Sequence, residues 1–438
     1  MGGSDKCGDL VARIASGEAR AGVVGLGYVG LPLAVEFAES GLVTTGIDVD
    51  AGKVEQINAG RSYVLDVPSE RVAALVDAGC LAATTDFSVV AELDTINVCV
   101  PTPLRKTREP DLSFVVDALG RIAEHMHAGQ LLILESTTYP GTTEELVVPT
   151  LREAGFEPGR DVEVAFSPER TDPGNVEFTT RNIPKVVGGM TERANEAASA
   201  LYGRCIDRVV PVSSPRVAEL VKLLENTFRN VNIALVNELA MMCGQLDIDV
   251  WEVIDAAATK PFGFMPFYPG PGLGGHCIPI DPQYLTWKAR AEGFEARLIE
   301  LASQINAQKP AYIVERIADA LNEREIALKS STVLALGVAY KRDVDDVRES
   351  PALDVMELLA EKGSDVRFTD PMVATVRVGE RELAAVELSE DALKEADATI
   401  LLTDHSAFDY GWIAETARLI IDTRNAFKGV AGSNIIRV

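Results

Sequence analysis

Basic residues are scarce in this sequence relative to acidic ones. Its 438 residues include 41 Lys and Arg against 66 Asp and Glu, which gives a formal net charge of -25 at pH 7. Nucleic-acid phosphates and anionic lipid headgroups repel a protein of this charge, so neither is an expected partner. An anionic small molecule is still compatible with the composition, because a few Lys and Arg suffice for a local positive site.

Paired cysteines and long apolar runs are also missing. The cysteines form no C-x-x-C pair and no metal-ligand spacing with histidine, so no metal site is expected; they are Cys7, Cys80, Cys99, Cys205, Cys243 and Cys277. Scattered thiols of this kind fit a reduced, cytoplasmic protein. No apolar run approaches the ~18 residues that span a bilayer, and no basic stretch followed by an apolar one marks a signal peptide. We therefore expect a cytoplasmic protein without a membrane segment.

The length of the chain and two blocks of alternating strand and helix patterns predict three domains. Short apolar runs bounded by Gly, Pro or Asp are typical of parallel strands that are buried on both faces. The predicted strands are 21–25, 44–48, 95–100, 131–135, 162–166, 185–188, 332–336, 365–369, 399–402 and 419–422. We expect an α/β fold in which two Rossmann-like parallel-sheet domains (1–212 and 329–438) are joined by a helical central domain (213–328) with one long helix.

The central domain contains this long predicted helix. Ser214 and Pro215 fit an N-cap and a first helical position, and apolar residues at helical spacing follow over residues 216–246. In one interpretation the helix packs against its own copy, which predicts a homodimer or a larger homo-oligomer. In the other it is an intramolecular core helix, and the pattern alone does not decide between the two.

Gly25, Gly27 and Gly30 form a G-x-G-x-x-G motif directly after a predicted strand and before a helical pattern. These glycines allow a tight turn, close approach of the backbone to a pyrophosphate, and close packing of helix on strand. Asp48 ends the next strand, where it can accept hydrogen bonds from ribose hydroxyls. No Arg follows Asp48 to receive a 2′-phosphate, so the sequence predicts NAD rather than NADP as the cofactor.

Other residues are expected near the cofactor because they lie within the glycine motif or after a strand end. They are Tyr28, Val29, Lys53, Thr102 and Thr138. The hydroxyls of the two threonines are placed to reach the nicotinamide, its ribose or a reacting oxygen. Lys53 is equally compatible with a solvated helix face.

A glycine-rich loop over residues 268–282 presents a lone thiol, Cys277, next to His276 and four positions before Asp281. A dehydrogenase that stops at a carbonyl needs no thiol, whereas a thiolate adds to an aldehyde and makes a second hydride available. The loop therefore predicts a four-electron oxidation, with Asp281 as a base or an orienting group. A buried structural thiol is the alternative, although a glycine-flanked loop is a poor place for a core residue.

Two further pairs of polar residues are expected in the chemical site. Lys222 and Asn226 are one turn apart on the long predicted helix, so they project from one face. A solvated Lys and a buried or capping Asn would show the same spacing. Glu169 and Arg170 follow another predicted strand, where Glu169 is placed to orient water, and a Glu–Arg surface pair is the alternative.

Taken in order from about residue 21 to 427, these motifs resemble the nucleotide-sugar 6-dehydrogenases, the UDP-glucose and UDP-N-acetylhexosamine dehydrogenase family. The resemblance implies that two NAD+ oxidise the C6 hydroxymethyl group of the sugar to a carboxylate. It implies that Cys277 adds to the aldehyde, while Lys222 and Asn226 stabilise the resulting oxyanion. It further implies that Asp281, Thr138 and Glu169 handle water and protons.

The same resemblance assigns UDP binding to the C-terminal domain. It implies that Lys341 and Arg424 reach the substrate and that Arg348 reaches the cofactor. Substrate contacts are expected from the remaining matched positions, which are Glu169, Arg170, Lys222, Asn226, Tyr268, Gly272, Gly274, Gly275 and His276.

The residues around Cys277 look most like the UDP-N-acetylglucosamine 6-dehydrogenase branch. His276 precedes the thiol and Ile-Pro-Ile follows it over residues 278–280, where UDP-glucose enzymes usually carry Ser and a Phe-Gln-Lys run. The UDP-N-acetylmannosamine branch shares Gly-Gly-His-Cys and is the nearest alternative. A two-electron β-hydroxyacid dehydrogenase shares the Rossmann and helical domains, but it leaves Cys277 and the second α/β block unexplained.

Overall fold

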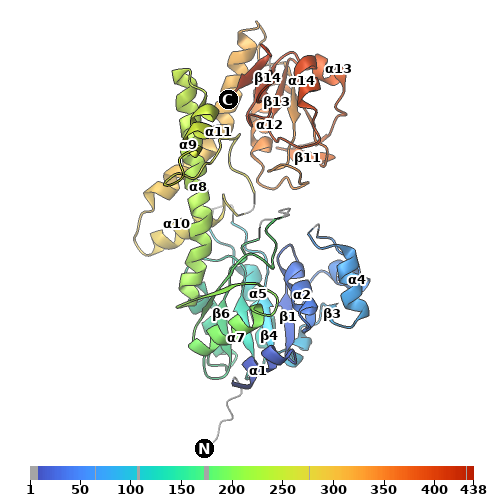
Figure 1. Cartoon of the computed structure of the whole chain (residues 1–438), viewed down its shortest axis with the longest axis vertical. Helices are drawn as coiled ribbons and strands as arrows, with labels where there is room; N and C mark the ends of the chain where they lie inside the picture. Colours follow the sequence, from blue (N-terminus) through green and yellow to red (C-terminus); the bar gives the residue numbers. More distant parts are fainter. Residues whose placement is uncertain (1–7, 65, 106–108, 172–176, 276, 431) are drawn as a thin grey trace, which may run out of the picture. The chain divides into compact units, whose positions relative to one another are not determined.

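The computed structural model describes residues 8–64, 66–105, 109–171, 177–275, 277–430 and 432–438. Its contacts divide the chain into two compact units. One contains the chain up to Glu225 and Gln283–Gly293, and the other contains Asn226–Pro282 and Phe294–Val438. Helices α8 (Pro215–Leu246), the longest in Figure 1, and α10 (Asp281–Ala291) contribute residues to both units.

The first unit is built on one sheet with the strand order β3-β2-β1-β4-β5-β6-β7-β8. Neighbouring strands run parallel, but β7 runs antiparallel to β6. All residues of β4, β5 and β6 are buried, as expected for strands that are covered on both faces. The strands are β1 (Arg20–Val24), β2 (Val43–Ile47), β3 (Leu81–Thr84), β4 (Thr95–Val98), β5 (Leu131–Leu134), β6 (Glu163–Phe166), β7 (Lys185–Gly189) and β8 (Val209–Val212).

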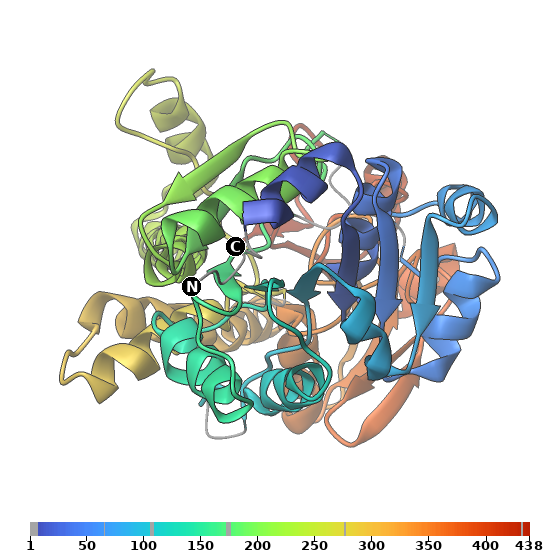
Figure 2. The ribbon, with the colours of Figure 1, turned by 90° about the horizontal axis from the view of Figure 1, so that it is seen from below.

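Helices cover both faces of this sheet. Leu10, Phe37 and Leu201, from α1, α2 and α7, belong to the core on one face, and Ile122 and Leu151, from α5 and α6, belong to the core on the other. Figure 2 shows the dark-blue α1 beside the green α7 on one side and the teal α5 and α6 on the opposite side. The elements are α1 (Gly8–Ser16), α2 (Gly30–Glu39), α3 (Ala51–Asn58), α4 (Ser69–Asp77), η1 (Phe87–Glu92), α5 (Ser113–Ala123), η2 (Thr143–Val147), α6 (Val148–Glu153) and α7 (Glu192–Tyr202).

The second unit contains a smaller parallel sheet with the order β10-β9-β13-β14-β15 and an antiparallel hairpin of β11 and β12. Helices α11 and α12 pack in the core on one face of the sheet, and α13 and α14 pack in the core on the other. The strands are β9 (Thr332–Leu336), β10 (Asp365–Thr369), β11 (Thr375–Val378), β12 (Arg381–Ala384), β13 (Ala398–Leu401), β14 (Ile420–Asp422) and β15 (Ile435–Arg437). The helices, besides parts of α8 and α10, are α9 (Val250–Ala258), α11 (Arg297–Asn322), α12 (Pro351–Glu361), α13 (Glu390–Glu395) and α14 (Tyr410–Thr416).

The turn after β9 repeats the turn after β1. Gly337 and Gly25 both have positive φ, at 75° and 89°, where a residue without a side chain is favoured. In each case an aspartate at the end of the neighbouring strand accepts the N–H that follows the glycine, at 2.7 Å for both Asp370 and Asp48. The difference is His405, whose Nε2 lies 3.1 Å from Asp370 Oδ2 and whose side chain is fully buried.

The α/β architecture with parallel sheets and a long central helix is confirmed. Helix α8 begins at Pro215, and Ser214 Oγ accepts the N–H of Val217 at 3.3 Å, as an N-cap does. The first sheet departs from the parallel direction at one pairing, where β7 runs antiparallel to β6, because an apolar pattern carries no information on strand direction. The domain limits 1–212, 213–328 and 329–438 stay a prediction.

Five strands with weak apolar signals, β3, β8, β11, β12 and β15, are not among the predicted ones. β3 has the sequence Leu-Ala-Ala-Thr, and β8 is only partly buried because it forms an edge of its sheet. Strands β11 and β12 contain charged residues between their apolar ones, and β15 is only three residues long. Over the described ranges, no helix has both the length and the apolar character needed to cross a membrane.

Lys309 is a buried lysine in the middle of α11. Its side chain is 0% exposed, and within the part of the chain that the structure describes its Nζ has no hydrogen-bond partner. The Nζ lies 4.8 Å from the centre of the Tyr312 ring. Burial disfavours the charged form and lowers the pKa of Lys309 to about 8.

Lys309→Met is expected to raise the free energy of unfolding at pH 7, by up to about 3 kcal/mol, because folding then no longer buries an ammonium group. Between pH 8 and 10.5 the unfolded wild type binds more protons than the folded one, so its stability rises with pH. Urea unfolding should therefore show a smaller difference in the free energy of unfolding between Lys309→Met and wild type at pH 10 than at pH 7. Lys362→Met, at an exposed position, is the control. An equal difference between Lys309→Met and wild type at both pH values would contradict the lowered pKa of Lys309.

Candidate active site

The glycine loop after β1 has the geometry of a dinucleotide site. Gly25 takes a φ of 89°, and a Cβ on Gly30 would lie 1.8 Å from the Gly25 oxygen, so both positions require glycine. A Cβ on Gly27 would meet no atom within 4 Å, so the loop is open at that point. Tyr28 is 53% exposed, and Val29 is half-buried just before α2 begins. The open backbone at the start of a helix fits the pyrophosphate of NAD.

Asp48 lies at the end of β2 with a side chain that is 7% exposed. Its Oδ2 accepts the N–H of Leu26 at 2.7 Å and lies 3.4 Å from Lys53 Nζ, while its Oδ1 accepts the N–H of Asp50 at 2.9 Å. A carboxylate oxygen has two lone pairs, so Asp48 keeps acceptor capacity for ribose hydroxyls. Lys53 is one-third exposed and turns towards this carboxylate.

Thr102 and Thr138 follow β4 and β5, as predicted. The Thr102 carbonyl accepts a hydrogen bond from Tyr284 at 2.9 Å, and its side chain is half-buried. Thr138 is 1% exposed, and among the described residues its Oγ1 has no hydrogen-bond partner. A buried hydroxyl of this kind is normally satisfied by water or a ligand, so Thr138 is a suitable contact for a bound molecule.

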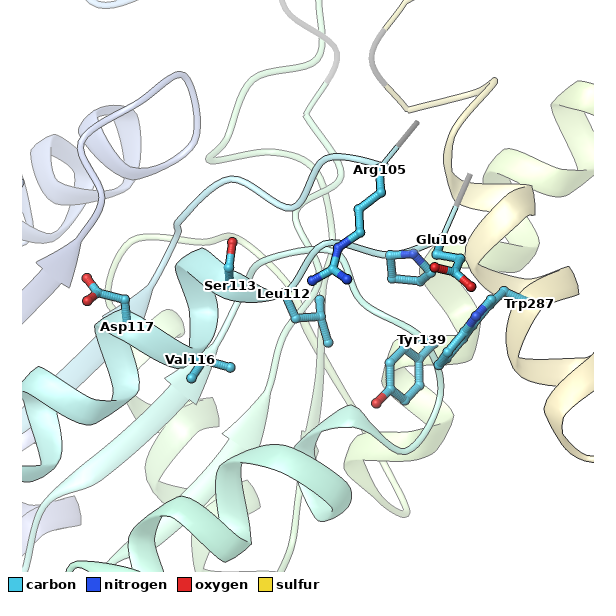
Figure 3. A pocket seen from close by; sticks show the side chains of 9 residues that line it. Arg105, Glu109, Leu112, Ser113, Val116, Asp117, Tyr139 and Trp287 are labelled. Atoms are coloured by element: carbon cyan, nitrogen blue, oxygen red, sulfur yellow. The ribbon is translucent and has the colours of Figure 1, made fainter. Parts of the chain in front are cut away.

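An open pocket of about 560 Å³ lies in the same unit, beside the segments that follow β4 and β5 (Figure 3). Tyr139 and Trp287 lie side by side with ring centres 5.1 Å apart and ring planes tilted by 48°, and Arg105 extends towards them. The remaining lining residues are Glu109, Pro110, Leu112, Ser113, Val116 and Asp117. No sequence motif predicted this pocket, because Trp287 joins it from a part of the chain that is distant in sequence.

A buried cluster of charged side chains lies at the ends of β5, β6 and β7. Lys185 Nζ donates to Glu135 Oε2 at 2.7 Å and to Glu169 Oε2 at 3.0 Å. Tyr202 and Asn97 donate to the other oxygen of Glu135, at 2.7 and 2.6 Å. The side chains of Lys185, Glu135 and Glu169 are 5%, 0% and 15% exposed, so the ion pairs are shielded from water.

This cluster sets the protonation of Glu169. Burial opposes ionisation, but the charge of Lys185 and hydrogen bonds from Thr171 outweigh it and lower the pKa of Glu169 to about 2. Burial likewise opposes the charge on Lys185, but the two glutamates outweigh it and raise the pKa of Lys185. The sequence analysis identified Glu169 and the strand end at Glu135, but it gave Lys185 no role.

Glu169 also fixes the position of Lys222. The backbone oxygen of Glu169 accepts a hydrogen bond from Lys222 Nζ at 2.6 Å, and Lys222 is 8% exposed. The neighbouring Arg170 points elsewhere, because it pairs with Glu225 at 2.6 Å and donates to the Pro184 carbonyl. The alternative of a solvated Lys222 is therefore wrong, whereas Arg170 is half-buried in an ion pair.

The thiol loop lies in the second unit. Cys277 is half-buried, and its carbonyl accepts the N–H of Asp281 at 2.8 Å, where α10 begins. Asp281 is 2% exposed, and its Oδ2 accepts a hydrogen bond from Asn226 Nδ2 at 2.5 Å. The structure thus brings Cys277, Asp281 and Asn226 together. His276 lies outside the described residues.

The glycines of this loop allow close packing on the start of α12 and on the loop after β9. A Cβ on Gly272 would lie 2.8 Å from Pro351, and one on Gly274 would lie 3.0 Å from Tyr340 Cβ. Gly275 has a φ of 93°, which favours glycine. Tyr268, at the start of the loop, is 46% exposed and donates to Asp255 at 2.9 Å.

The three basic residues assigned to the C-terminal domain lie at strand ends or in the loop after β9. Arg424 follows β14 and donates to the Leu402 carbonyl at 2.8 Å; its Nη1 would be 2.9 Å from a Cβ on Gly270, so it lies beside the thiol loop. Lys341 Nζ lies 5.8 Å from the centre of the Tyr340 ring. Arg348 is half-exposed and pairs with Asp346 at 2.6 Å. Within the described ranges, no group of three His, Cys, Asp or Glu residues is placed to hold a metal ion.

Comparison with known proteins finds matches over most of the chain. Residues 19–206 match the NAD binding domain of the UDP-glucose/GDP-mannose dehydrogenase family, residues 216–308 match its central domain, and residues 334–429 match its UDP binding domain. The chain is 36% identical over 416 residues to UDP-N-acetyl-D-glucosamine 6-dehydrogenase of Pseudomonas aeruginosa, covering 94% of this chain and 92% of that protein.

Other relatives carry different sugar names. NDP-N-acetyl-D-galactosaminuronic acid dehydrogenase of Ralstonia nicotianae is 37% identical over 421 residues, covering 92% of this chain and 95% of that protein. The solved structure of UDP-D-ManNAc dehydrogenase from Pyrococcus horikoshii superposes with a TM-score of 0.87 at 34% identity, covering 95% of this chain and 98% of that one. With its NAD binding domain, its UDP binding domain and their shared fold, the chain belongs to the UDP-glucose/GDP-mannose dehydrogenase family and is a nucleotide-sugar dehydrogenase.

Proposed function

We propose that this enzyme oxidises C6 of a UDP-N-acetylhexosamine from the alcohol to the carboxylate, and that the sugar is N-acetylglucosamine. The observation that carries the four-electron reaction is the thiol loop, in which Cys277 adjoins the hydrogen-bonded pair of Asp281 and Asn226. N-acetylglucosamine is favoured by the residues around Cys277 and by one group of relatives. Other relatives are named for N-acetylmannosamine or N-acetylgalactosaminuronic acid, so these sugars are alternative substrates, and UDP-glucose is a further one.

The chain's own residues supply the covalent steps. When bound at the glycine loop, NAD+ would supply the hydride acceptor for two successive oxidations of C6. The first oxidation removes a hydride and the hydroxyl proton from the C6 alcohol and leaves an aldehyde. Cys277 Sγ then adds to the aldehyde carbon, and the former carbonyl oxygen becomes the oxygen of a thiohemiacetal. The second oxidation leaves a thioester on Cys277. Water attacks this thioester, which releases the carboxylate and regenerates the thiol.

Lys222 and Asn226 are the proposed donors to the developing negative oxygen. Each already makes one hydrogen bond, Lys222 to the Glu169 carbonyl and Asn226 to Asp281. An ammonium has three donor hydrogens and an amide has two, so both keep a donor for the substrate. A preorganised donor at such an oxygen typically contributes about 3–4 kcal/mol to the transition state.

The proton and water steps divide between the remaining polar residues. Glu169, with a pKa of about 2, is a weak proton acceptor, so we assign it to holding Lys222 and orienting water. Asp281 is the proposed proton acceptor, because it is buried beside the thiol loop and accepts from Asn226. Thr138, whose buried hydroxyl lacks a partner among the described residues, is the proposed contact to the reacting oxygen or to water.

Binding of the two nucleotides follows the predicted assignments. We propose that NAD contacts Gly25, Gly27, Tyr28, Val29, Gly30, Asp48, Lys53, Thr102, Thr138 and Arg348. For the UDP-sugar, the proposed contacts besides the catalytic residues are Arg170, Tyr268, Gly272, Gly274, Gly275, His276, Lys341 and Arg424. A cytoplasmic location and a role in polysaccharide biosynthesis belong to the same proposal.

The test is the yield of NADH per sugar with a panel of UDP-sugars. UDP-N-acetylglucosamine is expected to give two NADH and one uronic acid, at a higher kcat/KM than the N-acetylmannosamine, N-acetylgalactosamine and glucose compounds. One NADH per sugar, with the aldehyde as product, would refute the four-electron reaction and favour a two-electron dehydrogenase. A higher kcat/KM for another sugar would refute only the choice of substrate.

We also propose that α8 forms a homodimer or larger homo-oligomer. Large apolar side chains are exposed along it at helical spacing, namely Val217, Leu220, Leu224, Phe228 and Leu235, at 39–61% exposure. Such a stripe on a single chain is typical of an interface. Sedimentation equilibrium is expected to show a dimer for the wild type and a larger monomer fraction for Leu224→Asp. A monomeric wild type at micromolar concentration would contradict the proposal.

A further inference from the structure

Three asparagines occupy one face of α8 in the second unit. Asn226, Asn230 and Asn237 are separated by four and seven residues, which correspond to about one and two helical turns. They are 6%, 1% and 0% exposed. Buried amides at helical repeats are unusual, because each must find polar partners away from water.

All three amides bond to the loop that carries the thiol. Asn237 Oδ1 accepts the N–H of Gly270 at 3.1 Å, and Asn230 Nδ2 donates to the Ile278 carbonyl at 3.3 Å. Asn226 Nδ2 donates to Asp281. The contacts therefore fall at Gly270, Ile278 and Asp281, and Ile278 directly follows Cys277.

A fourth asparagine joins these contacts from another helix. Asn306 of α11 is 4% exposed; its Oδ1 accepts from Asn237 Nδ2 at 3.0 Å, and its Nδ2 donates to the Asn230 backbone carbonyl at 3.2 Å. Asn306 thus fixes the orientation of the Asn237 amide, whose oxygen must face Gly270. An amide suits this position because it donates and accepts at the same time.

The loop depends on these side chains because it has no regular structure of its own. Over the described residues, no helix or strand lies between the end of α9 at Ala258 and the start of α10 at Asp281. On its other side the loop packs through Gly272 and Gly274 against Pro351 and Tyr340. The amides of Asn226, Asn230 and Asn237 thus provide three polar contacts between α8 and this loop.

We propose that Asn230, Asn237 and Asn306 are positioning residues that hold the segment 270–281 on α8, so that Cys277 stands at a fixed place relative to Asn226 and Asp281. The positioning itself is a property of the fold, whereas its effect on turnover rests on the proposed thioester route. A displacement of about 1 Å at a reacting atom typically lowers a rate by about a hundredfold.

The test is Asn237→Ala, which removes the acceptor of the Gly270 N–H and the donor to Asn306. Asn232→Ala is the matched control, since Asn232 is on the same helix and donates to the Phe228 carbonyl one turn before it. We expect the kcat for uronic acid formation to fall at least tenfold in Asn237→Ala, with the KM for NAD unchanged. A larger fraction of the sugar should be released as the aldehyde. The control should match the wild type.

A second measurement does not depend on turnover. The rate of iodoacetamide labelling of Cys277, read from the modified peptide by mass spectrometry, is expected to rise at least threefold in Asn237→Ala, because the half-buried thiol becomes more accessible. If Asn237→Ala does not fold, both assays are applied to Asn306→Ala, which removes the hydrogen bonds to Asn237 and to the Asn230 carbonyl but keeps the Asn237 acceptor of the Gly270 N–H. A folded variant with wild-type kcat and wild-type labelling overturns the proposal. If the wild type itself yields one NADH per sugar, the thioester route fails, and the labelling rates still decide the positioning.

Discussion

Cys277→Ala is expected to reduce the formation of uronic acid by about a thousandfold or more, because no other group on the chain is proposed to hold the aldehyde for the second oxidation. The first oxidation does not use the thiol, so the variant should release aldehyde at a measurable rate. Rapid-quench analysis of aldehyde and acid, together with NADH absorbance, measures both. Cys277→Ser should form an ester that hydrolyses more slowly than the thioester, which mass spectrometry of the intact protein would detect.

The matched control for this substitution is Cys243→Ala. Cys243 is a thiol in the same unit that is 6% exposed and packs in the apolar cluster of α8 and α9, and no part of the predicted chemistry uses it. Its kcat should equal that of the wild type. Wild-type acid production by a folded Cys277→Ala enzyme would show that the thiol is structural and would remove the thioester from the mechanism.

Lys185→Met is expected to destabilise the first unit by about 3–5 kcal/mol, because it leaves the buried carboxylates of Glu135 and Glu169 without their cation. Urea unfolding followed by circular dichroism at pH 7 measures the loss. Since the pKa of Glu169 is held below its unfolded value, its ion pair contributes stability above about pH 4.5. This contribution is lost as the pH falls towards about 2, so the difference between variant and wild type should shrink over that range.

Two comparisons make this prediction specific. Lys394→Met removes an exposed lysine that pairs with Glu390 on the surface, and it should shift the urea midpoint little. Adding Glu135→Gln to Lys185→Met removes one of the two uncompensated charges, so the double variant should recover part of the lost stability. A Lys185→Met midpoint equal to that of Lys394→Met would contradict the importance of the buried cluster.

The sequence predicts those parts of the architecture whose signals come from residues that are close together in the chain. The strand after Ser331 and the strand ending at Thr369 were predicted with the bounds that β9 and β10 show, because apolar runs flanked by glycine or aspartate define them. The glycine motif and Asp48 were placed for the same reason, since a short turn connects them to their strands. The family comparison confirms NAD as the cofactor of this domain.

The parts that sequence could not predict depend on contacts across long separations. Lys185 reaches Glu135 over 50 positions, and this pair exists only because β5, β6 and β7 are neighbours, with β7 reversed. Asn237 and Asn306 are 69 positions apart on different helices. No local pattern separates a buried asparagine that binds a loop from one that caps or faces solvent, so these residues were visible only in the fold.

The repeated turn after β1 and β9 has a consequence for telling two nucleotides apart. Asp48 and Asp370 support their glycine turns in the same way, yet the Asp370 side chain is fully buried and its Oδ2 also faces His405. That carboxylate is committed to the protein, whereas Asp48 keeps lone pairs for a ribose. An enzyme that must hold NAD and a UDP-sugar at once thereby avoids presenting two equivalent acceptors for ribose hydroxyls. The side chain of His405 makes the difference between the two carboxylates.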